Sequence, residues 1–251
     1  MKLFVPTRYR TTSAEIMDDF TLEGEELRDA LDKIAAINQL LGGNKITLDG
    51  INQLIEKQIF EKEITIIDIG CGNGDMLRTL ANYAQKLNLD FNLIGVDANA
   101  FTINHAKELS SAFPNISFRC EDIFDPSFNE MNCDIFLCTL TLHHFKDNEI
   151  LKLLHQLYTN ANIGIVINDL QRSGLAYRLF QVLCFVFRLN TMSREDGLTS
   201  ILRGFKKEEL HYFSKQLNFK KRTIRWKWAF RYQWIISKYE CKNMYCSQTI
   251  T

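Results

Sequence analysis

The sequence predicts an α/β fold in which a mostly parallel sheet of seven strands carries helices on both faces. Short runs rich in β-branched residues alternate along the chain with longer segments whose apolar residues recur at helical spacing. This alternation is typical of a parallel sheet with crossover helices. Of the 251 residues, 46% are hydrophobic and 18 are Phe, which is enough apolar material for the core of one domain.

The N-terminal residues 1–62 are expected to form a helical cap. Leucine and isoleucine recur at helical spacing within residues 27–41, and Gly42 with Gly43 indicates the end of that helix. A second short helix over residues 48–61 would then lead into the first strand.

The core is expected over residues 63–170. Its strands are predicted at Ile64–Ile69, Phe91–Val96, Ile116–Arg119, Cys133–Cys138 and Ile163–Asn168. Helical segments separate these strands. Because ligands of such sheets bind beyond the carboxyl ends of the strands, we expect the residues that follow the strands to share one crevice.

The first strand contains Asp68 and runs into a loop rich in glycine. The loop consists of Gly70, Cys71, Gly72, Asn73 and Gly74. Glycine lets the backbone approach a ligand closely, and the helix that begins at Asp75 would present backbone N–H groups to it. The spacing Gly-x-Gly-x-Gly differs from the Gly-x-Gly-x-x-Gly of dinucleotide-binding sheets, which argues against a nicotinamide oxidoreductase. Asp97 and Ala98 follow the second strand, and the Asp97 carboxylate could accept hydrogen bonds from both hydroxyls of a ribose.

This order of strand, glycine loop, helix, strand and terminal acid resembles the class I S-adenosylmethionine (SAM) methyltransferases over roughly residues 60–170. The resemblance implies a Rossmann-like sheet whose last strand is antiparallel, SAM as cofactor and S-adenosylhomocysteine (SAH) as product. It also implies that Asp122 accepts a hydrogen bond from the adenine amino group, while the Ile123 backbone N–H meets a ring nitrogen. The expected cofactor-binding residues are Asp68, Gly70, Cys71, Gly72, Asn73, Gly74, Asp97, Ala98, Asp122, Ile123, Thr139 and Leu140.

His143 and His144 follow the fourth strand and are the candidates for a catalytic base. An imidazole titrates near neutral pH and could remove a proton from a hydroxyl or an activated carbon, although one histidine could instead only shape the cofactor pocket. The Asp/Asn-Pro-Pro-aromatic motif of amino-directed methyltransferases is absent. We therefore expect the acceptor to be an oxygen or carbon of a small apolar or aromatic molecule, by resemblance to quinone-pathway and polyketide enzymes; carboxyl methylation of a fatty or aromatic acid is the open alternative.

Residues 171–205 form an insertion that we expect to act as a lid over the acceptor. Its first half, 174–189, is apolar on nearly all sides, but it is too short to span a membrane and it contains arginines. We expect it to be buried between sheet and cap; lining an apolar pocket or contacting a membrane surface are the alternatives. In its second half, Arg194 and Arg203 could hold an acceptor carboxylate or phenolate, or pair with neighbouring acids. This half resembles a bacterial methyltransferase subgroup associated with polyketide and lipid biosynthesis.

A helix and an antiparallel strand pair are expected over residues 206–238, followed by a loose tail at 239–251. The 30 basic and 30 acidic side chains give zero net charge, so no global field favours nucleic acid. The 7 cysteines include no Cys-x-x-Cys pair, and no metal site is expected. Without a signal-like N-terminus, we expect a cytoplasmic protein. Methylation of tRNA or protein, and SAM binding without catalysis, remain as alternative functions.

Overall fold

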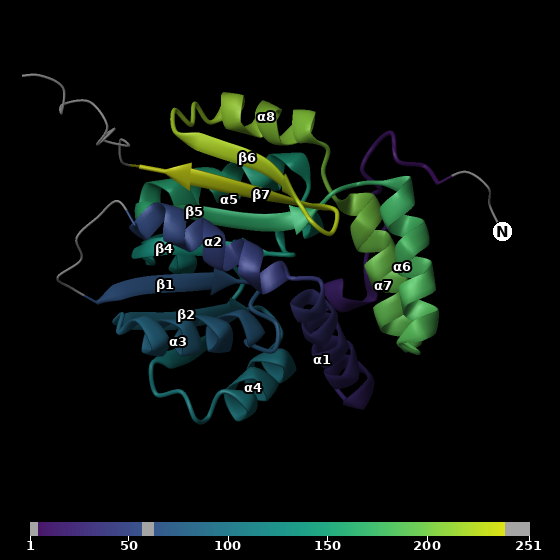
Figure 1. Ribbon diagram of the computed structural model, residues 1–251, viewed down its shortest axis with the longest axis horizontal. Coiled ribbons are helices and arrows are strands. Elements are labelled where there is room, and N and C mark those ends of the chain that lie inside the picture. The colour runs from purple at the N-terminus through teal and green to yellow at the C-terminus, as the bar shows by residue number, and fades with distance from the viewer. Residues whose placement is uncertain (1–4, 57–62, 239–251) are drawn as a thin grey trace, which may run out of the picture.

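The computed structural model describes residues 5–56 and 63–238, and within them the chain forms one seven-stranded sheet in the order β3-β2-β1-β4-β5-β7-β6 (Figure 1). The strands are β1 Ile64–Ile69, β2 Phe91–Asp97, β3 Ile116–Cys120, β4 Cys133–Thr139, β5 Ala161–Leu170, β6 Arg222–Lys227 and β7 Arg231–Ser237. Neighbours from β3 to β5 pair in parallel, whereas β7 is antiparallel to both β5 and β6. The predicted α/β sheet with an antiparallel last strand is confirmed.

Helices cover both faces of this sheet and the end at which its parallel strands finish. They are α1 Glu25–Leu40, α2 Gly43–Ile55, α3 Asp75–Leu87, α4 Ala100–Leu109, α5 Asp147–Asn160, α6 Gly174–Val186, α7 Thr191–Arg203 and α8 Lys207–Gln216. Successive residues of a strand point to opposite faces. Accordingly, Ile66 of β1 belongs to the core beneath α2 and α3, whereas Ile67 belongs to the core beneath α5 and α8.

The two N-terminal helices have different roles in the fold. Gly42 adopts a left-handed conformation, with φ of 75°, and α2 begins immediately after it. The sequence placed the start of this helix at residue 48; the early start is stabilised by Asn44, whose amide donates hydrogen bonds to Asp75 and Thr79 of α3. As a result, α2 packs on one face of the sheet, and α1 lies beyond the carboxyl ends of the parallel strands. The predicted continuation over residues 57–61 lies outside the described residues, as does the tail at 239–251.

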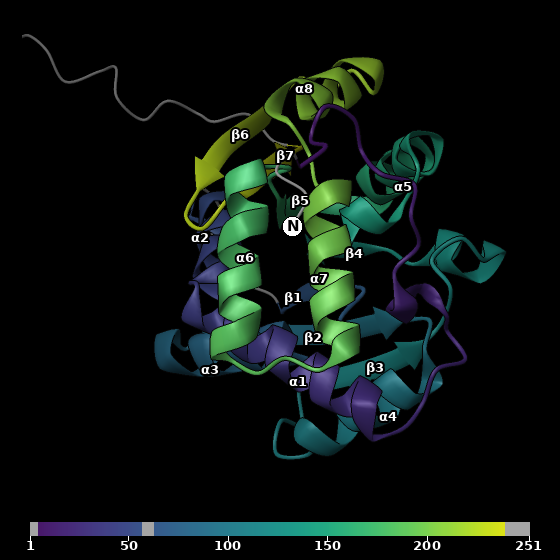
Figure 2. The ribbon, with the colours of Figure 1, turned by 90° about the vertical axis from the view of Figure 1, so that its right-hand side faces the viewer.

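The insertion forms two adjacent helices, α6 and α7, which also lie beyond the carboxyl ends of the parallel strands (Figure 2). The prediction that the apolar helix α6 is buried was wrong, because only Ala176 and Cys184 of this helix are buried. Helix α6 packs along α7 on one side and turns another side to solvent, where Phe185 is 85% exposed. Hydropathy measures how apolar a helix is but does not identify its packing partner. No helix in the described part of the chain is long and apolar enough to cross a membrane.

Candidate functional site

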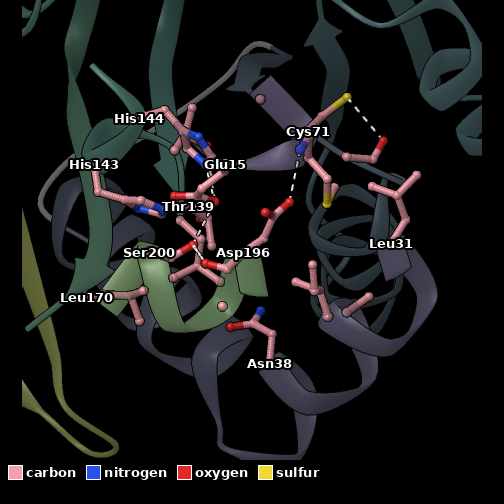
Figure 3. Close-up of a pocket in the computed structure, with 18 of the residues that line it drawn as sticks. Glu15, Leu31, Asn38, Cys71, Thr139, His143, His144, Leu170, Asp196 and Ser200 are labelled. Atoms are coloured by element: carbon pink, nitrogen blue, oxygen red, sulfur yellow. Dashed lines mark hydrogen bonds and ion pairs between the residues drawn. The ribbon is translucent and has the colours of Figure 1, made fainter. Parts of the chain in front are cut away.

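A pocket of about 850 Å³ opens at the carboxyl ends of the parallel strands, between the strand loops and helices α1, α6 and α7 (Figure 3). This volume falls in the range of sites for cofactors and small molecules. Of the cofactor residues expected from the sequence, those that line it are Asp68, Gly70, Cys71, Gly72, Asn73, Asp97, Ala98, Asp122, Ile123, Thr139 and Leu140. Gly74 lies outside the lining and is the residue before α3.

The glycine loop is held in a shape that other residues would strain. Gly70, Gly72 and Gly74 all have positive φ, between 52° and 77°. At Gly70 a Cβ would also lie 2.5 Å from the side chain of Thr141. The backbone N–H of Gly72 donates a hydrogen bond of 3.1 Å to Oδ2 of Asp97. The loop and the acid after β2 are therefore one connected structure facing the pocket.

The acids on this side of the pocket lie close to one another, with Asp68 buried and Asp97 and Asp75 half-buried. Burial, together with the charges of Asp97 and Asp75, raises the pKa of Asp68 to about 8. Burial likewise raises the pKa of Asp97, although backbone N–H groups of Asn99 and Gly72 donate to its carboxylate and oppose the rise. A carboxylate that retains acceptor capacity beside a glycine loop can bind the hydroxyls of a polar ligand.

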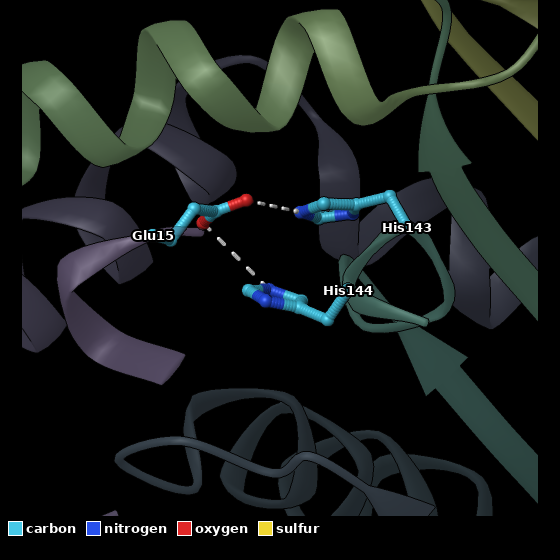
Figure 4. Close-up of side chains that lie close together, drawn as sticks. All are labelled: Glu15, His143 and His144. Atoms are coloured by element: carbon cyan, nitrogen blue, oxygen red, sulfur yellow. Dashed lines mark ion pairs between the residues drawn. The ribbon is translucent and has the colours of Figure 1, made fainter. Parts of the chain in front are cut away.

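A second group of side chains, Glu15, His143 and His144, lies across the same pocket from Cys71 of the glycine loop (Figure 3), and its members lie close together (Figure 4). The Nε2 atom of His143 is 3.7 Å from Oε1 of Glu15, and that of His144 is 3.9 Å from Oε2. Glu15 comes from the segment before η1 (Ile16–Asp18), whereas the histidines belong to η3 (Leu142–His144) after β4. Among the described residues, neither Glu15 Oε1 nor His143 Nε2 has a hydrogen-bond partner.

Each histidine is oriented by an aspartate on its other ring nitrogen. Nδ1 of His143 lies 2.7 Å from Oδ1 of Asp169, and Nδ1 of His144 lies 2.7 Å from Oδ1 of Asp18. Since an ionised carboxylate only accepts hydrogen bonds, the ring protons belong on Nδ1 and the Nε2 lone pairs face Glu15. Burial opposes ionisation of both aspartates, but the charge and hydrogen bond of His143 outweigh it for Asp169, and the hydrogen bonds from His144, Arg203 and the Glu15 backbone outweigh it for Asp18, so the pKa of each aspartate is lowered.

Glu15 is itself only 6% exposed, and burial raises its pKa to about 7 against the opposing effects of His144, Ser200 and Arg203. The Ser200 hydroxyl donates a hydrogen bond of 2.7 Å to Oε2. Nη1 of Arg203 lies 3.5 Å from Oε1. A carboxyl that titrates near neutral pH beside two imidazoles is suited to accepting and returning a proton.

Residues 66–164 match the family model of the methyltransferase domain. Residues 66–164 thus form a methyltransferase domain. In sequence the chain is 31% identical over 133 residues to carboxy-S-adenosyl-L-methionine synthase of Campylobacter jejuni, which covers 52% of this chain and 54% of the relative. A putative methyltransferase of Invertebrate iridescent virus 6 is 40% identical over 76 residues, covering 30% and 26% of the two chains. The chain thus spans about half the length, or less, of these relatives.

The fold of this chain is also found in solved structures. The plantazolicin methyltransferase BpumL in complex with SAH has a TM-score of 0.61 at 17% identity, over 84% of this chain and 95% of that one. Human N-acetylserotonin methyltransferase in complex with SAM has a TM-score of 0.60 at 14% identity, over 85% and 56%. At these identities the likeness shows the fold alone.

The two arginines that the sequence offered for acceptor binding, Arg194 and Arg203, do not line the pocket. Arg194 is exposed, and its guanidinium is 3.6 Å from Glu195. Arg203 donates a hydrogen bond of 2.5 Å to Asp18 and others to the backbone oxygens of His143 and His144. The alternative of a structural ion pair describes both arginines, and Arg203 ties the histidine loop to the N-terminal segment.

Sequence reasoning missed four polar residues in or beside this pocket, which are Glu15, Asp18, Asp169 and Arg231. Glu15 and Asp18 lie in a short segment without helical periodicity, and only their acidity beside Ile16 and Met17 set them apart. Asp169 lies near the end of β5, and Arg231 is the first residue of β7. These positions place both residues at the crevice, but the sequence does not show which side chains they contact.

Proposed function

We propose that the protein transfers a methyl group from SAM to an oxygen or carbon of a small apolar or aromatic molecule. The observation that carries this proposal is that one pocket joins the glycine loop to the group of Glu15, His143 and His144. Positioning and acid–base chemistry then act on the same bound pair of molecules. We further propose a single cytoplasmic domain in which residues 171–205 form the lid.

The cofactor would occupy the strand side of the pocket. Asp97 would accept hydrogen bonds from the ribose hydroxyls, and Asp122 with Ile123 would hold the adenine. One oxygen of Asp122 already accepts from the backbone N–H of Phe124, which fixes the carboxylate while its other oxygen stays available. The glycine loop and Leu140 would contact the methionine part, placing the sulfonium toward the histidines.

The acceptor would lie under the lid. Apolar side chains of α6 form this wall of the pocket, among them Leu179, Phe180 and Leu183. Trp228 and Phe230 of the turn between β6 and β7 form another part of it. An apolar wall of this kind favours an apolar or aromatic acceptor over a sugar or a nucleic acid base edge.

The proton released by the acceptor would be taken up by Nε2 of His143. When bound, SAM would supply the methyl group to the acceptor atom and would be left as SAH. Asp169 stabilises the resulting imidazolium, because it is ionised and hydrogen-bonded to Nδ1. Glu15, with a pKa of about 7, can pass the proton onward to solvent through the pocket.

The ligand atoms of Glu15, His143 and His144 lie within 4.8 Å of one another, a separation that a divalent metal ion could also fill. We favour acid–base chemistry because the Arg203 guanidinium, 3.5 Å from Glu15, already supplies a positive charge there. We therefore expect turnover to persist after exhaustive dialysis against a chelator.

The test is incubation of the protein with methyl-labelled SAM and a panel of phenols, 1,3-dicarbonyl compounds and aromatic acids, followed by mass spectrometry. We expect label in a small organic product, and its loss in His143→Ala with SAH binding retained. Label only in tRNA or protein would support the macromolecular alternative. SAH binding without transfer to any of these classes would support a non-catalytic protein.

Carboxylation of SAM itself is a second candidate, favoured by the sequence match to carboxy-S-adenosyl-L-methionine synthase of Campylobacter jejuni. The same incubations, supplemented with a carboxyl donor such as bicarbonate or an acid that readily loses CO₂, distinguish it, because the modified cofactor would gain the mass of the carboxyl group while no acceptor gained a methyl group.

A further inference from the structure

Arg231 is a buried cation that lines the acceptor side of the pocket. It is the first residue of β7 and pairs with Leu170, the last residue of β5, so it lies at the carboxyl ends of the parallel strands, beside the pocket. It is only 3% exposed. Among the described residues, its Nε and Nη1 atoms have no hydrogen-bond partner. Burial lowers the pKa of Arg231 to about 10, opposed by the charge of Asp169, and so the guanidinium stays protonated at neutral pH.

The other buried arginines of the described chain are saturated by protein groups. Arg172, also 3% exposed, binds both carboxylate oxygens of Glu209 at 2.6 and 3.0 Å and donates to backbone oxygens as well. Arg203 binds Asp18 and the backbone of the histidine loop. Buried guanidinium groups are stabilised by such partners, and one left without them is destabilising. Arg231 is thus the exception in this fold, and it faces the pocket.

Asp169 does not supply the missing partner. Its Oδ1 accepts hydrogen bonds from Nδ1 of His143 and from the backbone N–H of Leu170, and its Oδ2 accepts from the backbone N–H of His143. The charge of Asp169 acts on Arg231, but its hydrogen-bonding capacity is directed at the histidine loop. A ligand anion beside Arg231 would therefore lie near the proposed base.

The surroundings of Arg231 restrict the kind of anion. The pocket residues next to it in the chain are Trp228, Ala229 and Phe230, and α6 contributes Leu179 and Phe180 to the same pocket. An apolar wall with a single buried cation matches an apolar molecule that carries one negative charge. The adjacent negative charge of Asp169 disfavours a dianion such as a phosphate monoester.

We propose that the acceptor is an apolar carboxylic acid whose carboxylate binds the guanidinium of Arg231. This assignment rests on the methyltransferase function proposed above, and it names the substrate class of the same site. The carboxylate anchors the molecule, and its apolar body lies against α6 and the turn between β6 and β7. The reacting oxygen or carbon then approaches His143 with its orientation fixed at two points.

Direct binding tests the assignment independently of turnover. The intact protein, saturated with SAH, is titrated by calorimetry with matched probes, 2-naphthoic acid against 2-naphthylmethanol and dodecanoic acid against dodecanol. We expect each acid to bind about tenfold or more tightly than its alcohol, since a charge-assisted hydrogen bond replaces a neutral contact. Arg231→Met should abolish the preference for the acid while leaving the affinity for the alcohol unchanged.

Arg194→Met is the matched control, because it removes an exposed arginine outside the pocket and should keep the preference. Arg231→Lys keeps the cation and should retain a weaker preference; it decides the question if Arg231→Met does not fold. Equal binding of acid and alcohol by the intact protein, or an unchanged preference in Arg231→Met, would overturn the assignment. Failure of the methyltransferase proposal would appear separately, as absent SAH binding or absent methyl transfer with the acid preference intact.

Discussion

Asp169→Asn is the substitution that tests the acid–base proposal most directly. The two carboxylate oxygens of Asp169 accept three hydrogen bonds, from Nδ1 of His143 at 2.7 Å, from the backbone N–H of Leu170 at 2.7 Å and from the backbone N–H of His143 at 3.1 Å. Asparagine has the same shape but replaces one oxygen with an NH₂ group. Since all three partners are donors, this NH₂ group must meet a donor in either orientation.

Both orientations remove the proposed base. If the NH₂ group faces Nδ1 of His143, the ring proton moves to Nε2. Nε2 then has no lone pair with which to take up the proton of the methyl acceptor. If it faces the backbone N–H of His143, that contact becomes repulsive and the histidine loop shifts. A general base contributes about 10²–10⁴-fold to rate, so kcat should fall by a factor in that range, equivalent to about 3–5 kcal/mol.

The assay is steady-state transfer of labelled methyl to the best acceptor, with SAH affinity measured in parallel by calorimetry. SAH affinity should stay within about twofold, because the cofactor contacts lie across the pocket. Asp125→Asn, at an exposed position outside the pocket lining, should leave both quantities unchanged. A kcat within about fivefold of the wild-type value, in a folded Asp169→Asn protein that binds SAH normally, would refute the assignment of His143 as base.

Three further expectations follow from the same geometry. Asp97→Ala should weaken SAH binding by about 10²–10⁴-fold in calorimetry, through the loss of two charge-assisted hydrogen bonds of about 1.5–3 kcal/mol each; an affinity within threefold of the Asp125→Ala control would contradict the ribose assignment. Because the folded pKa is about 7 for Glu15 and about 8 for Asp68, against 4.5 and 3.8 without the fold, the folded protein holds protons that the unfolded chain has released. The free energy of unfolding of the ligand-free protein should therefore fall as pH rises from about 5 to 8, by up to about 1.4 kcal/mol per pH unit for each group. Urea denaturation should show a flatter profile for Glu15→Gln and Asp68→Asn, and a wild-type stability that rises across this window would show the sign to be wrong. Finally, if the exposed face of α6 contacts membranes, Phe185→Asp should lower cosedimentation with anionic lipid vesicles about tenfold, whereas Leu87→Asp, at an exposed leucine of α3, should not; equal cosedimentation of the two variants would exclude α6 as the contact.

The sheet could be predicted closely because its signals are local. β1 begins and ends at the predicted residues, Ile64 and Ile69, since a run of isoleucines is bounded by polar residues on one side and by the glycine loop on the other. The ends of β5 were missed by two residues on each side because Ala161 and Leu170 carry no strand signal of their own. Strand existence follows from composition, whereas strand length depends on the neighbours that supply hydrogen bonds.

The candidate site divides in the same way. The glycine loop and Asp97 follow strands directly and could be predicted from spacing. Glu15 and Asp169 reach His143 only through tertiary packing, from a segment before α1 and from the neighbouring strand. The sequence offered arginines in the lid for acceptor binding, and the structure instead buries Arg231 of the hairpin in the pocket. Nothing in local periodicity could distinguish an arginine that pairs within the fold from one that lacks a partner.

Asp169 connects the two proposals in physical terms. Its negative charge stabilises both the Arg231 cation and the protonated form of His143, and these two positive groups therefore compete for it. When a ligand carboxylate binds Arg231, it partly neutralises the positive charge of the guanidinium, and a protonated His143 is then repelled less by it. Binding of a carboxylic acid would then strengthen the base that acts on it, whereas the matching alcohol would leave the base unchanged. An anionic acceptor should for this reason have a higher kcat as well as a lower KM than the matching alcohol. The difference in kcat follows from the shared aspartate and not from contact area.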